Sequence, residues 1–310
     1  MRVIAPGVTE IDTLLGGWEQ ATAGYLLGGD APVLVETGSQ SSVPVLLGAL
    51  EEMGIGADDL AGIAVTHVHL DHAGGVGDVA RSFPNATVYV HELGARHLVD
   101  PTRLVSSAAR VYGPLLDDLY GRLDPTEPAR VQVLLDGESV DLGGGRSLSA
   151  IDSPGHAKHH LGFLDSASGL LFAGDAVGVR LPGGGSLRPA TPPPDFDLDL
   201  ALGSLERFGS LHPVGIALAH YGLVPGDPGE LLMEAAETLR HWAEEARRAF
   251  ASGRDIAHAL EERFSEEVPE EDPEQRRKLE TLNGFHSNAA GFRRWLETSG
   301  ARAKAPEDGP

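Results

Sequence analysis

Residues 63–75 read Ile-Ala-Val-Thr-His-Val-His-Leu-Asp-His-Ala-Gly-Gly, and no other stretch of the chain is as informative. An apolar run is followed within six residues by four side chains that can bind a metal, namely His67, His69, Asp71 and His72. On an extended segment, residues two apart point to the same side, so His67 and His69 can share one ion. Asp71 and His72 come from the turn that follows and can face a second ion. Crowded neutral imidazoles gain little without a cation between them, so a metal site is expected rather than surface or capping histidines.

Three more candidate ligands lie where later apolar runs end. His156 lies on a Pro-Gly turn after one such run, and Asp175 and His220 each come within two residues of the end of another. A single residue of this kind after a strand usually has no function, but three in succession after the cluster support one another. Together with residues 67–72 they make a set of candidate metal ligands spread along the chain.

Composition limits the partners and the ligand chemistry. The 310 residues include 24 Lys and Arg against 46 Asp and Glu, which gives a formal charge of −22. Nucleic acid is bound mainly by Lys and Arg on phosphates, so no nucleic-acid partner is expected. No uncharged run approaches the roughly 20 residues of a membrane span, so we expect no membrane partner and a cytoplasmic protein. The chain has no Cys, which leaves His and carboxylates as metal ligands.

The pattern along the first two thirds predicts a mixed α/β fold, because short apolar runs alternate with Gly-rich turns and amphipathic segments. Strands are expected at residues 24–27, 33–36, 63–66, 87–90, 131–135, 148–152, 161–164, 170–173 and 216–219. Helices are expected at residues 43–53, 76–81, 93–99 and 198–208, each ending near a Gly or Pro. Two stretches depart from the alternation: residues 101–130 suggest an insertion or lid, and residues 178–195 a long irregular loop.

The C-terminal part has a helical pattern. From residue 232 onward, apolar residues recur at spacings of three and four, which predicts a helix with one apolar face. Gly253 is expected to end this helix and Asp255 to cap the next, with at least one more helix in residues 274–298. We therefore expect a catalytic domain at residues 1–228, a helical region packed on it at residues 229–300, and a disordered tail at residues 301–310.

The ordered set of candidate ligands resembles the metallo-β-lactamase fold superfamily. The matching residues are H-x-H-x-D-H at 67–72, then Gly155-His156, Gly174-Asp175 and His220. The resemblance covers residues 25–222 and implies an α/β fold: a four-layer αβ/βα sandwich with a dinuclear site at one edge and, here, a C-terminal helical appendage. The set lacks a Cys ligand, so it is more similar to the glyoxalase II and lactonase branch of metallohydrolases than to β-lactamases that use one.

The resemblance also implies a role for each candidate ligand. His67, His69 and His156 resemble the ligands of a first metal, Asp71, His72 and His220 those of a second, and Asp175 the carboxylate that bridges both. The expected cofactors are two divalent metal ions. Zinc is the expected metal, and iron and manganese are the alternatives. One departure is Glu36 in Val35-Glu36-Thr37-Gly38, where the family usually has Asp, and we expect it to support the histidines rather than to bind metal.

This site predicts a hydrolase that acts on a small molecule. Two ions close together can hold a water and lower its pKa, so that a metal-bound hydroxide attacks an ester, thioester or lactone. Asp71 is expected to bind an ion and to orient the water. Tyr221, next to His220, is either a hydrogen-bond donor to the substrate or an ordinary rim tyrosine. The oligomeric state and the natural substrate are left open.

Other functions compatible with the same fold remain as alternatives. Persulfide dioxygenases resemble this chain but use one iron held by two His and an Asp, whereas a flavo-diiron oxidoreductase would need a flavin domain. A non-catalytic binding protein of this fold would tend to lose ligands. Among the secondary candidates, His91 is expected to cap a helix, His159 and His160 to pack beside the site, and Arg180 and Arg188 to be solvated loop residues.

Overall fold

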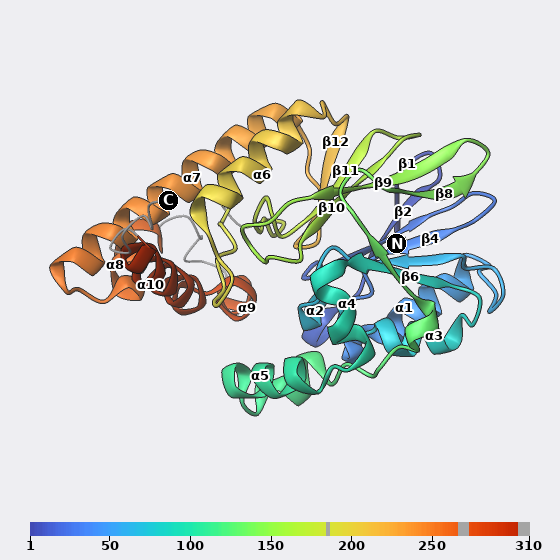
Figure 1. Cartoon of the computed structure of the whole chain (residues 1–310), viewed down its shortest axis with the longest axis horizontal. Helices are drawn as coiled ribbons and strands as arrows, with labels where there is room; N and C mark the ends of the chain where they lie inside the picture. Colours follow the sequence, from blue (N-terminus) through green and yellow to red (C-terminus); the bar gives the residue numbers. More distant parts are fainter. Residues whose placement is uncertain (184–186, 266–272, 303–310) are drawn as a thin grey trace, which may run out of the picture.

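The computed structural model describes residues 1–183, 187–265 and 273–302, in which two β-sheets pack face to face (Figure 1). The strands of the first sheet are, in spatial order, β1 Arg2–Ala5, β2 Val8–Asp12, β3 Ala23–Leu27, β4 Val33–Val35, β5 Gly62–Ala64, β6 Thr87–His91 and β7 Val131–Leu134. Those of the second are β13 Gly222–Leu223, β12 Gly215–Leu218, β11 Leu170–Gly174, β10 Leu161–Asp165, β9 Arg146–Asp152 and β8 Ser139–Gly143.

Helices cover the outer face of each sheet and extend beyond it. In chain order they are α1 Val43–Glu52, α2 Leu70–Ala73, α3 Val76–Ser82, α4 Glu92–Val99, α5 Thr102–Tyr112, α6 Leu198–Ser210, α7 Pro228–Ser252, α8 Ile256–Phe264, α9 Pro273–Asn283 and α10 Phe285–Arg302. Short 3₁₀ turns occupy residues 15–17, 40–42 and 128–130, and a π turn occupies residues 116–120. Within the described part of the chain, no helix combines the length and the apolar character that crossing a membrane requires.

The period-two alternation of the strands builds the layers. In β3, Tyr25 and Leu27 face the second sheet, while Leu26 packs with the helices of the first half. In β11, Phe172 lies in the layer between the sheets and Leu171 packs against α6 and α7. The Tyr25 hydroxyl also donates to the Leu218 carbonyl, 2.5 Å away, and so joins the two sheets. The order helices, sheet, sheet, helices is the four-layer αβ/βα sandwich that the sequence predicts.

The C-terminal helices share a core with the first turns of α6 beside the sandwich (Figure 1). Trp242 of α7 is fully buried and stacks between Phe264 of α8 and Phe285 of α10, with ring centroids 5.0 and 5.3 Å away. As expected, α7 ends at Gly253, which has a left-handed φ of 72°, and the Asp255 side chain caps α8. Because this core is closely packed, the C-terminal helices form one unit and do not extend loosely from the sandwich.

The expected strands and helices are all present within a few residues of their predicted bounds, but four strands were not predicted. β1 and β2 contain charged residues, β8 is short and polar, and β13 has two residues, so none shows a clear apolar run. The stretch at residues 101–130 contains α5 and the π turn. The loop at residues 178–195 is irregular, as predicted, with one bridge between Val179 and Arg188. α10 reaches Arg302, and the rest of the predicted tail, residues 303–310, lies outside the described residues.

Gly291 of α10 tests how tightly these helices pack on the sandwich. A Cβ at this position would lie 1.7 Å from the Thr191 carbonyl oxygen, so the helix and the loop at residues 187–194 are in direct backbone contact. We expect Gly291→Ala to destabilise the protein by about 1–3 kcal/mol, as overpacking does. Gly48 in the middle of α1 is the matched control, because nothing lies within 4 Å of its added Cβ.

Gly48→Ala should therefore leave stability unchanged or raise it by up to about 1 kcal/mol through helix propensity. Unfolding by heat or denaturant measures both variants. Equal stability of the two variants would show that α10 does not press on the loop.

Candidate functional site

Strand direction brings the candidate ligands to one edge of the sandwich. In the first sheet β4, β5 and β6 run parallel, so Glu36, after β4, and His67 and His69, after β5, leave the sheet at the same edge. In the second sheet β9, β11 and β12 share one direction, and His156, Asp175 and His220 follow their carboxyl ends. The structure thus joins side chains that lie up to 153 residues apart in sequence, counting from His67 to His220.

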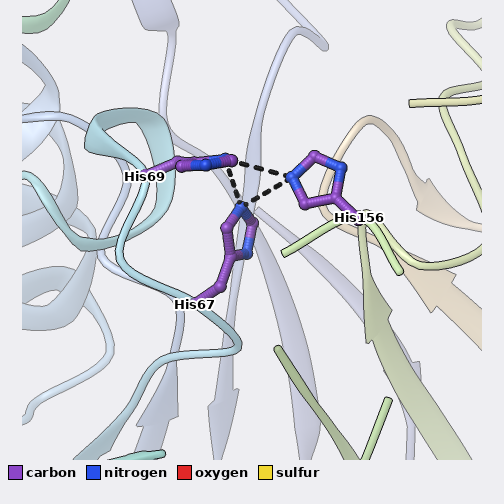
Figure 2. Close-up of side chains that lie close together, drawn as sticks. All are labelled: His67, His69 and His156. Carbon is purple, nitrogen blue, oxygen red and sulfur yellow. Dashed lines mark hydrogen bonds between the residues drawn. The ribbon is translucent and has the colours of Figure 1, made fainter. Parts of the chain in front are cut away.

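Three imidazoles point their ring nitrogens at one another (Figure 2). His67 Nε2 lies 2.9 Å from His69 Nδ1 and 3.2 Å from His156 Nε2, and His69 Nδ1 lies 3.0 Å from His156 Nε2. The three nitrogens come from two loops on different sheets. They form one group of potential ligand atoms.

A second group lies beside the first. Asp71 and His72 lie on α2 and meet His220, with 3.3 Å between His220 Nε2 and Asp71 Oδ2 and 3.7 Å between His72 Nε2 and Asp71 Oδ2. Asp175 lies between the groups: its Oδ2 is 3.5 Å from His72 Nε2 and 3.6 Å from His156 Nε2, and its Oδ1 is 3.6 Å from His220 Nε2. All seven candidate ligands therefore converge, with Asp175 in the middle.

Hydrogen bonds on the far side of each ring fix the orientation of three histidines. His72 Nδ1 donates to Glu36 Oε2 at 3.1 Å. His156 Nδ1 donates to the Ala190 carbonyl at 3.0 Å, and His220 Nδ1 to the Ala21 carbonyl at 2.9 Å. With Nδ1 donating away from the site, Nε2 of each ring faces the centre, which is the orientation that a metal ligand needs.

The buried donor set fits divalent metal ions. His72 Nε2 and Asp175 Oδ1 are buried and have no hydrogen-bond partner within the described part of the chain, although buried polar atoms are normally paired. Imidazole nitrogens and carboxylate oxygens suit zinc, iron and manganese alike. The residues present therefore account for a metal centre in this place.

Electrostatics separate the two groups of ligands. Burial lowers the pKa of His69 to about 3, and burial also holds the pKa of His67 well below its ordinary value, so both rings stay neutral. Burial would raise the pKa of Asp71 and Asp175, but the neighbouring histidines, His72 foremost, outweigh it and lower the pKa of both. The first group thus offers neutral imidazoles, and both carboxylates are ionised, which are the protonation states that bind a metal. Although burial opposes it, the carboxylates of Asp175 and Asp71 raise the pKa of His72 and His220, so these two rings attract a cation or a proton.

Two glycines allow the ligand loops to approach this closely. Gly174 has φ 50°, and a Cβ there would lie 2.6 Å from His160 Nε2 and from Thr66 Oγ1. The Asp175 N–H donates to the same His160 Nε2 at 3.2 Å, so His160 packs behind the Asp175 carboxylate as expected. Gly155, with φ 134°, would bring a Cβ within 2.3 Å of the Ala201 Cα.

A cavity of about 180 Å³ opens beside the ligands. His69, Asp71, His156 and Asp175 form its floor. One wall is α5, another is the loop through Pro192, and the third comes from the junction of α9 and α10 (Figure 1). The insertion, the long loop and the C-terminal helices therefore shape the space in which a substrate would meet the ligands.

The C-terminal helices also hold the loop that carries Ala190. Asn288 Oδ1 accepts from the Thr191 N–H at 2.8 Å and from the Thr191 hydroxyl at 2.8 Å. Asn288 Nδ2 donates to Asn283 Oδ1 at 2.6 Å, and Asn283 Nδ2 donates to the Pro189 carbonyl at 3.1 Å. The carbonyl that orients His156 thus lies between two backbone positions held by amide side chains of α9 and α10.

Tyr221 lies elsewhere. It lines a separate hollow with Arg2, Glu10 and Asp12, and it is absent from the residues that line the cavity beside the histidines. Burial and the carboxylate of Glu10 raise the pKa of its hydroxyl. This position gives no support to the expected contact between Tyr221 and a substrate, and it agrees with the alternative of a rim tyrosine.

Arg188 corrects one expectation, that of a solvated loop arginine. It is 2 % exposed, donates to Glu280 Oε1 at 2.8 Å and stacks over Phe285, 4.4 Å from the ring centroid. Arg180 is partly exposed and pairs with Glu234. The expectation failed because sequence alone does not show that α9 and α10 cover this loop.

Two smaller expectations concern histidines near the site. His91 caps α4 as predicted, because its Nδ1 accepts from the Leu93 N–H at 3.0 Å. His159 packs beside His69, with ring centroids 6.0 Å apart, and burial lowers its pKa to about 3.

Sequence reasoning missed Tyr112 at the end of α5. It lines the cavity, is 36 % exposed, and lies with its ring centroid 4.7 Å from that of Tyr120. Burial and the nearby Asp71 raise the pKa of Tyr112 to about 12, so its hydroxyl keeps its proton. The signal was the apolar stripe of α5, in which Leu104, Ala108 and Tyr112 recur at helical spacing.

Comparison with known proteins agrees with this geometry. The family model of the metallo-beta-lactamase superfamily matches residues 16–220. A metallo-beta-lactamase fold-containing protein of Sulfurisphaera tokodaii is 34% identical over 171 residues, which cover 54% of this chain and 62% of that protein. The solved structure of the superfamily protein from Sulfolobus tokodaii has a TM-score of 0.71 at 25% identity and covers 93% of this chain and 98% of that one.

Two further relatives carry the names of enzymes. A hydroxyacylglutathione hydrolase of a Synechococcus species is 30% identical over 166 residues, covering 54% of this chain and 50% of that protein. A thioesterase of Emericella nidulans is 29% identical over 162 residues, covering 51% of this chain and 36% of that protein. The chain thus spans less than two thirds of the length of each of these curated relatives.

Glu36 offers a test of the ligand support. Its buried carboxylate accepts from His72 Nδ1 and from the Thr66 N–H, at 2.9 Å for the latter. We expect Glu36→Gln to weaken metal binding about 10- to 100-fold, as loss of such partners does. Competition with a chromophoric chelator measures the affinity.

Glu10→Gln is the matched control. Glu10 is equally buried, at 2 % exposed, but pairs with Arg2 and the Leu223 N–H rather than with a histidine. An equal loss of affinity in both variants would mean that Glu36 acts through general stability only.

Proposed function

The chain belongs to the metallo-beta-lactamase superfamily, and from this we propose that it hydrolyses esters, thioesters or lactones with two divalent metal ions, zinc in the first place. One observation carries the proposal: seven histidine and aspartate side chains converge at one edge of the sandwich, with Asp175 between two groups, and four of the seven line a cavity. A mononuclear site would leave the group of Asp71, His72 and His220 without a purpose.

The chemistry of such a centre suits acyl transfer to water. Two bound divalent ions would lower the pKa of a shared water and polarise the carbonyl oxygen of the substrate. The protein's own residues then have three tasks. They hold the ions, they orient the water, and they enclose the acyl group so that bulk solvent does not compete.

Asp71 is proposed to orient the water. It lines the cavity, and its Oδ2 lies 3.3 Å from His220 Nε2. Its lowered pKa keeps it ionised near neutral pH, so a carboxylate oxygen is available to accept a proton or a hydrogen bond. A carboxylate has two oxygens, so one oxygen of Asp71 can orient the water while the other binds a metal ion.

Tyr112, rather than Tyr221, is proposed as the hydrogen-bond donor to the substrate. Its raised pKa keeps the hydroxyl protonated, and it lies in the cavity wall near Asp71. A neutral donor at this place can stabilise the oxygen of a tetrahedral intermediate.

The bond that is broken follows from the leaving group. An alkoxide or thiolate can leave while a cation stabilises it, whereas the amine of an ordinary amide must be protonated. The names of the relatives agree with this choice, since one is a hydroxyacylglutathione hydrolase and another a thioesterase.

A hydrolysis screen of the metal-loaded chain tests the proposal. We expect turnover of activated esters, acyl thioesters or lactones, weak or absent turnover of penicillins and cephalosporins, and loss of all activity with a chelator. Faster turnover of β-lactams than of every ester, thioester and lactone would overturn the substrate class.

The metal content of the same preparation distinguishes the proposed hydrolase from an iron dioxygenase. We expect about two metal ions per chain by elemental analysis, and His220→Ala should lower this number toward one, while the exposed His258→Ala should not. A single iron per chain, unchanged by His220→Ala, with oxygen consumed in the presence of glutathione persulfide, would favour the dioxygenase.

Asp71→Asn tests the water-orienting role. Loss of a group that handles the proton should lower kcat by about 10²-fold or more on a confirmed substrate. Asp199→Asn, at an exposed position on α6, is the control and should keep the wild-type kcat. A wild-type kcat in Asp71→Asn would remove Asp71 from the mechanism.

A further inference from the structure

The walls of the cavity are mainly apolar. Leu104 and Ala108 of α5 lie on one side, Leu282 of α9 on another, and Val179 and Pro192 of the long loop complete the enclosure. These residues come from segments far apart in sequence and present carbon atoms to the same space. Such a wall favours the burial of a hydrocarbon group.

Three polar side chains in the wall, those of Thr191, Asn283 and Asn288, are already engaged in hydrogen bonds. Thr191 gives its N–H and hydroxyl to Asn288, and Asn288 in turn donates to Asn283. Asn283 donates to the Pro189 carbonyl. These amides hold the loop in place, so they have little hydrogen-bonding capacity left for a substrate.

The wall has no positive charge. Among the residues that the structure describes, those lining the cavity include no Lys or Arg, and the only acidic ones are Asp71 and Asp175 on the floor. The two arginines of the long loop are committed elsewhere, Arg188 to Glu280 and Arg180 to Glu234. A carboxylate on the substrate, away from the floor, would lose its hydration without gaining a partner.

We propose that the cavity takes substrates with a neutral, apolar acyl group, and that it rejects acyl groups and thiol leaving groups that carry carboxylates. This rests on the proposed function and narrows it. It sets the chain apart from a hydrolase of glutathione thioesters, because glutathione carries carboxylates that this wall cannot pair. The acyl chain lies against Leu104, Ala108 and Leu282, with its carbonyl toward Asp71 and Tyr112.

A matched pair of thioesters tests the proposal. The N-acetylcysteamine thioesters of hexanoate and of adipate have six acyl carbons each and differ only in the terminal carboxylate. We expect the metal-loaded chain to prefer the hexanoyl thioester at least about tenfold in kcat/KM, chiefly through KM. S-hexanoylglutathione should fall below hexanoyl-N-acetylcysteamine for the same reason.

Ser287 allows the charge of the wall to be changed without disturbing the core, because it lines the cavity from an exposed position on α10. Ser287→Arg should narrow or reverse the preference for hexanoyl over adipoyl thioester. Ser287→Gln, similar in reach and neutral, should keep the preference. Circular dichroism and metal content confirm that both variants fold and bind metal.

The outcomes separate this proposal from the hydrolase itself. Equal or faster turnover of the adipoyl or glutathione thioester overturns the neutral acyl site and leaves the hydrolase standing. If no thioester is hydrolysed, binding of the unreactive hexanamide and of the adipic monoamide decides: tighter binding of hexanamide supports the acyl site, and equal or weaker binding overturns it.

Discussion

The burial of seven ionisable side chains at one edge of the sandwich is the constraint on which the rest of the structure depends. Charged groups removed from water are costly unless they are paired, and burial among neighbouring imidazoles lowers the pKa of His67 and His69. On the side of the rings that faces away from the site, hydrogen bonds offset part of this cost. Glu36 accepts from His72, and the carbonyls of Ala21 and Ala190 accept from His220 and His156. In front, His72 Nε2 and Asp175 Oδ1 are left for cations to satisfy. The carboxyl ends of four strands and the short helix α2 deliver the ligands, so regular structure holds the arrangement.

The C-terminal helices hold in place one of the groups that orient the ligands. The Ala190 carbonyl that orients His156 belongs to an irregular loop, and a loop by itself would not hold such an acceptor in place. Asn288 and the close contact at Gly291 fasten the loop to α10. Arg188, stacked on Phe285, joins it to the aromatic core of the helical body. The helical body and the ligand edge therefore form one mechanical unit, although they are separate in sequence.

The sequence predicts those parts of the molecule that repeat or cluster locally. Residues 67–72 indicate the site, and the short apolar runs between Gly-rich turns indicate the strands, because both patterns are visible within a short window. Partners supplied by distant segments have no such signal: the Ala190 carbonyl, Asn288 behind Thr191 and the burial of Arg188 depend on how α9 and α10 dock. Proximity in sequence also misled. Tyr221 adjoins His220 yet lines another hollow, whereas Tyr112 reaches the cavity from an insertion.

The net charge of the protein and the charge of the site favour different substrates. The charges next to the bound substrate have the larger effect on which substrate binds. A formal charge of −22 describes the surface as a whole and disfavours anions at long range. At the floor of the cavity, two divalent ions facing two carboxylates would leave a net positive centre that attracts a carbonyl oxygen. Between the two lies a wall without Lys or Arg among its described residues, in which Thr191, Asn288 and Asn283 are hydrogen-bonded to one another. Electrostatic attraction would then stabilise only the reacting carbonyl. The rest of the substrate would be stabilised by burial of its apolar surface.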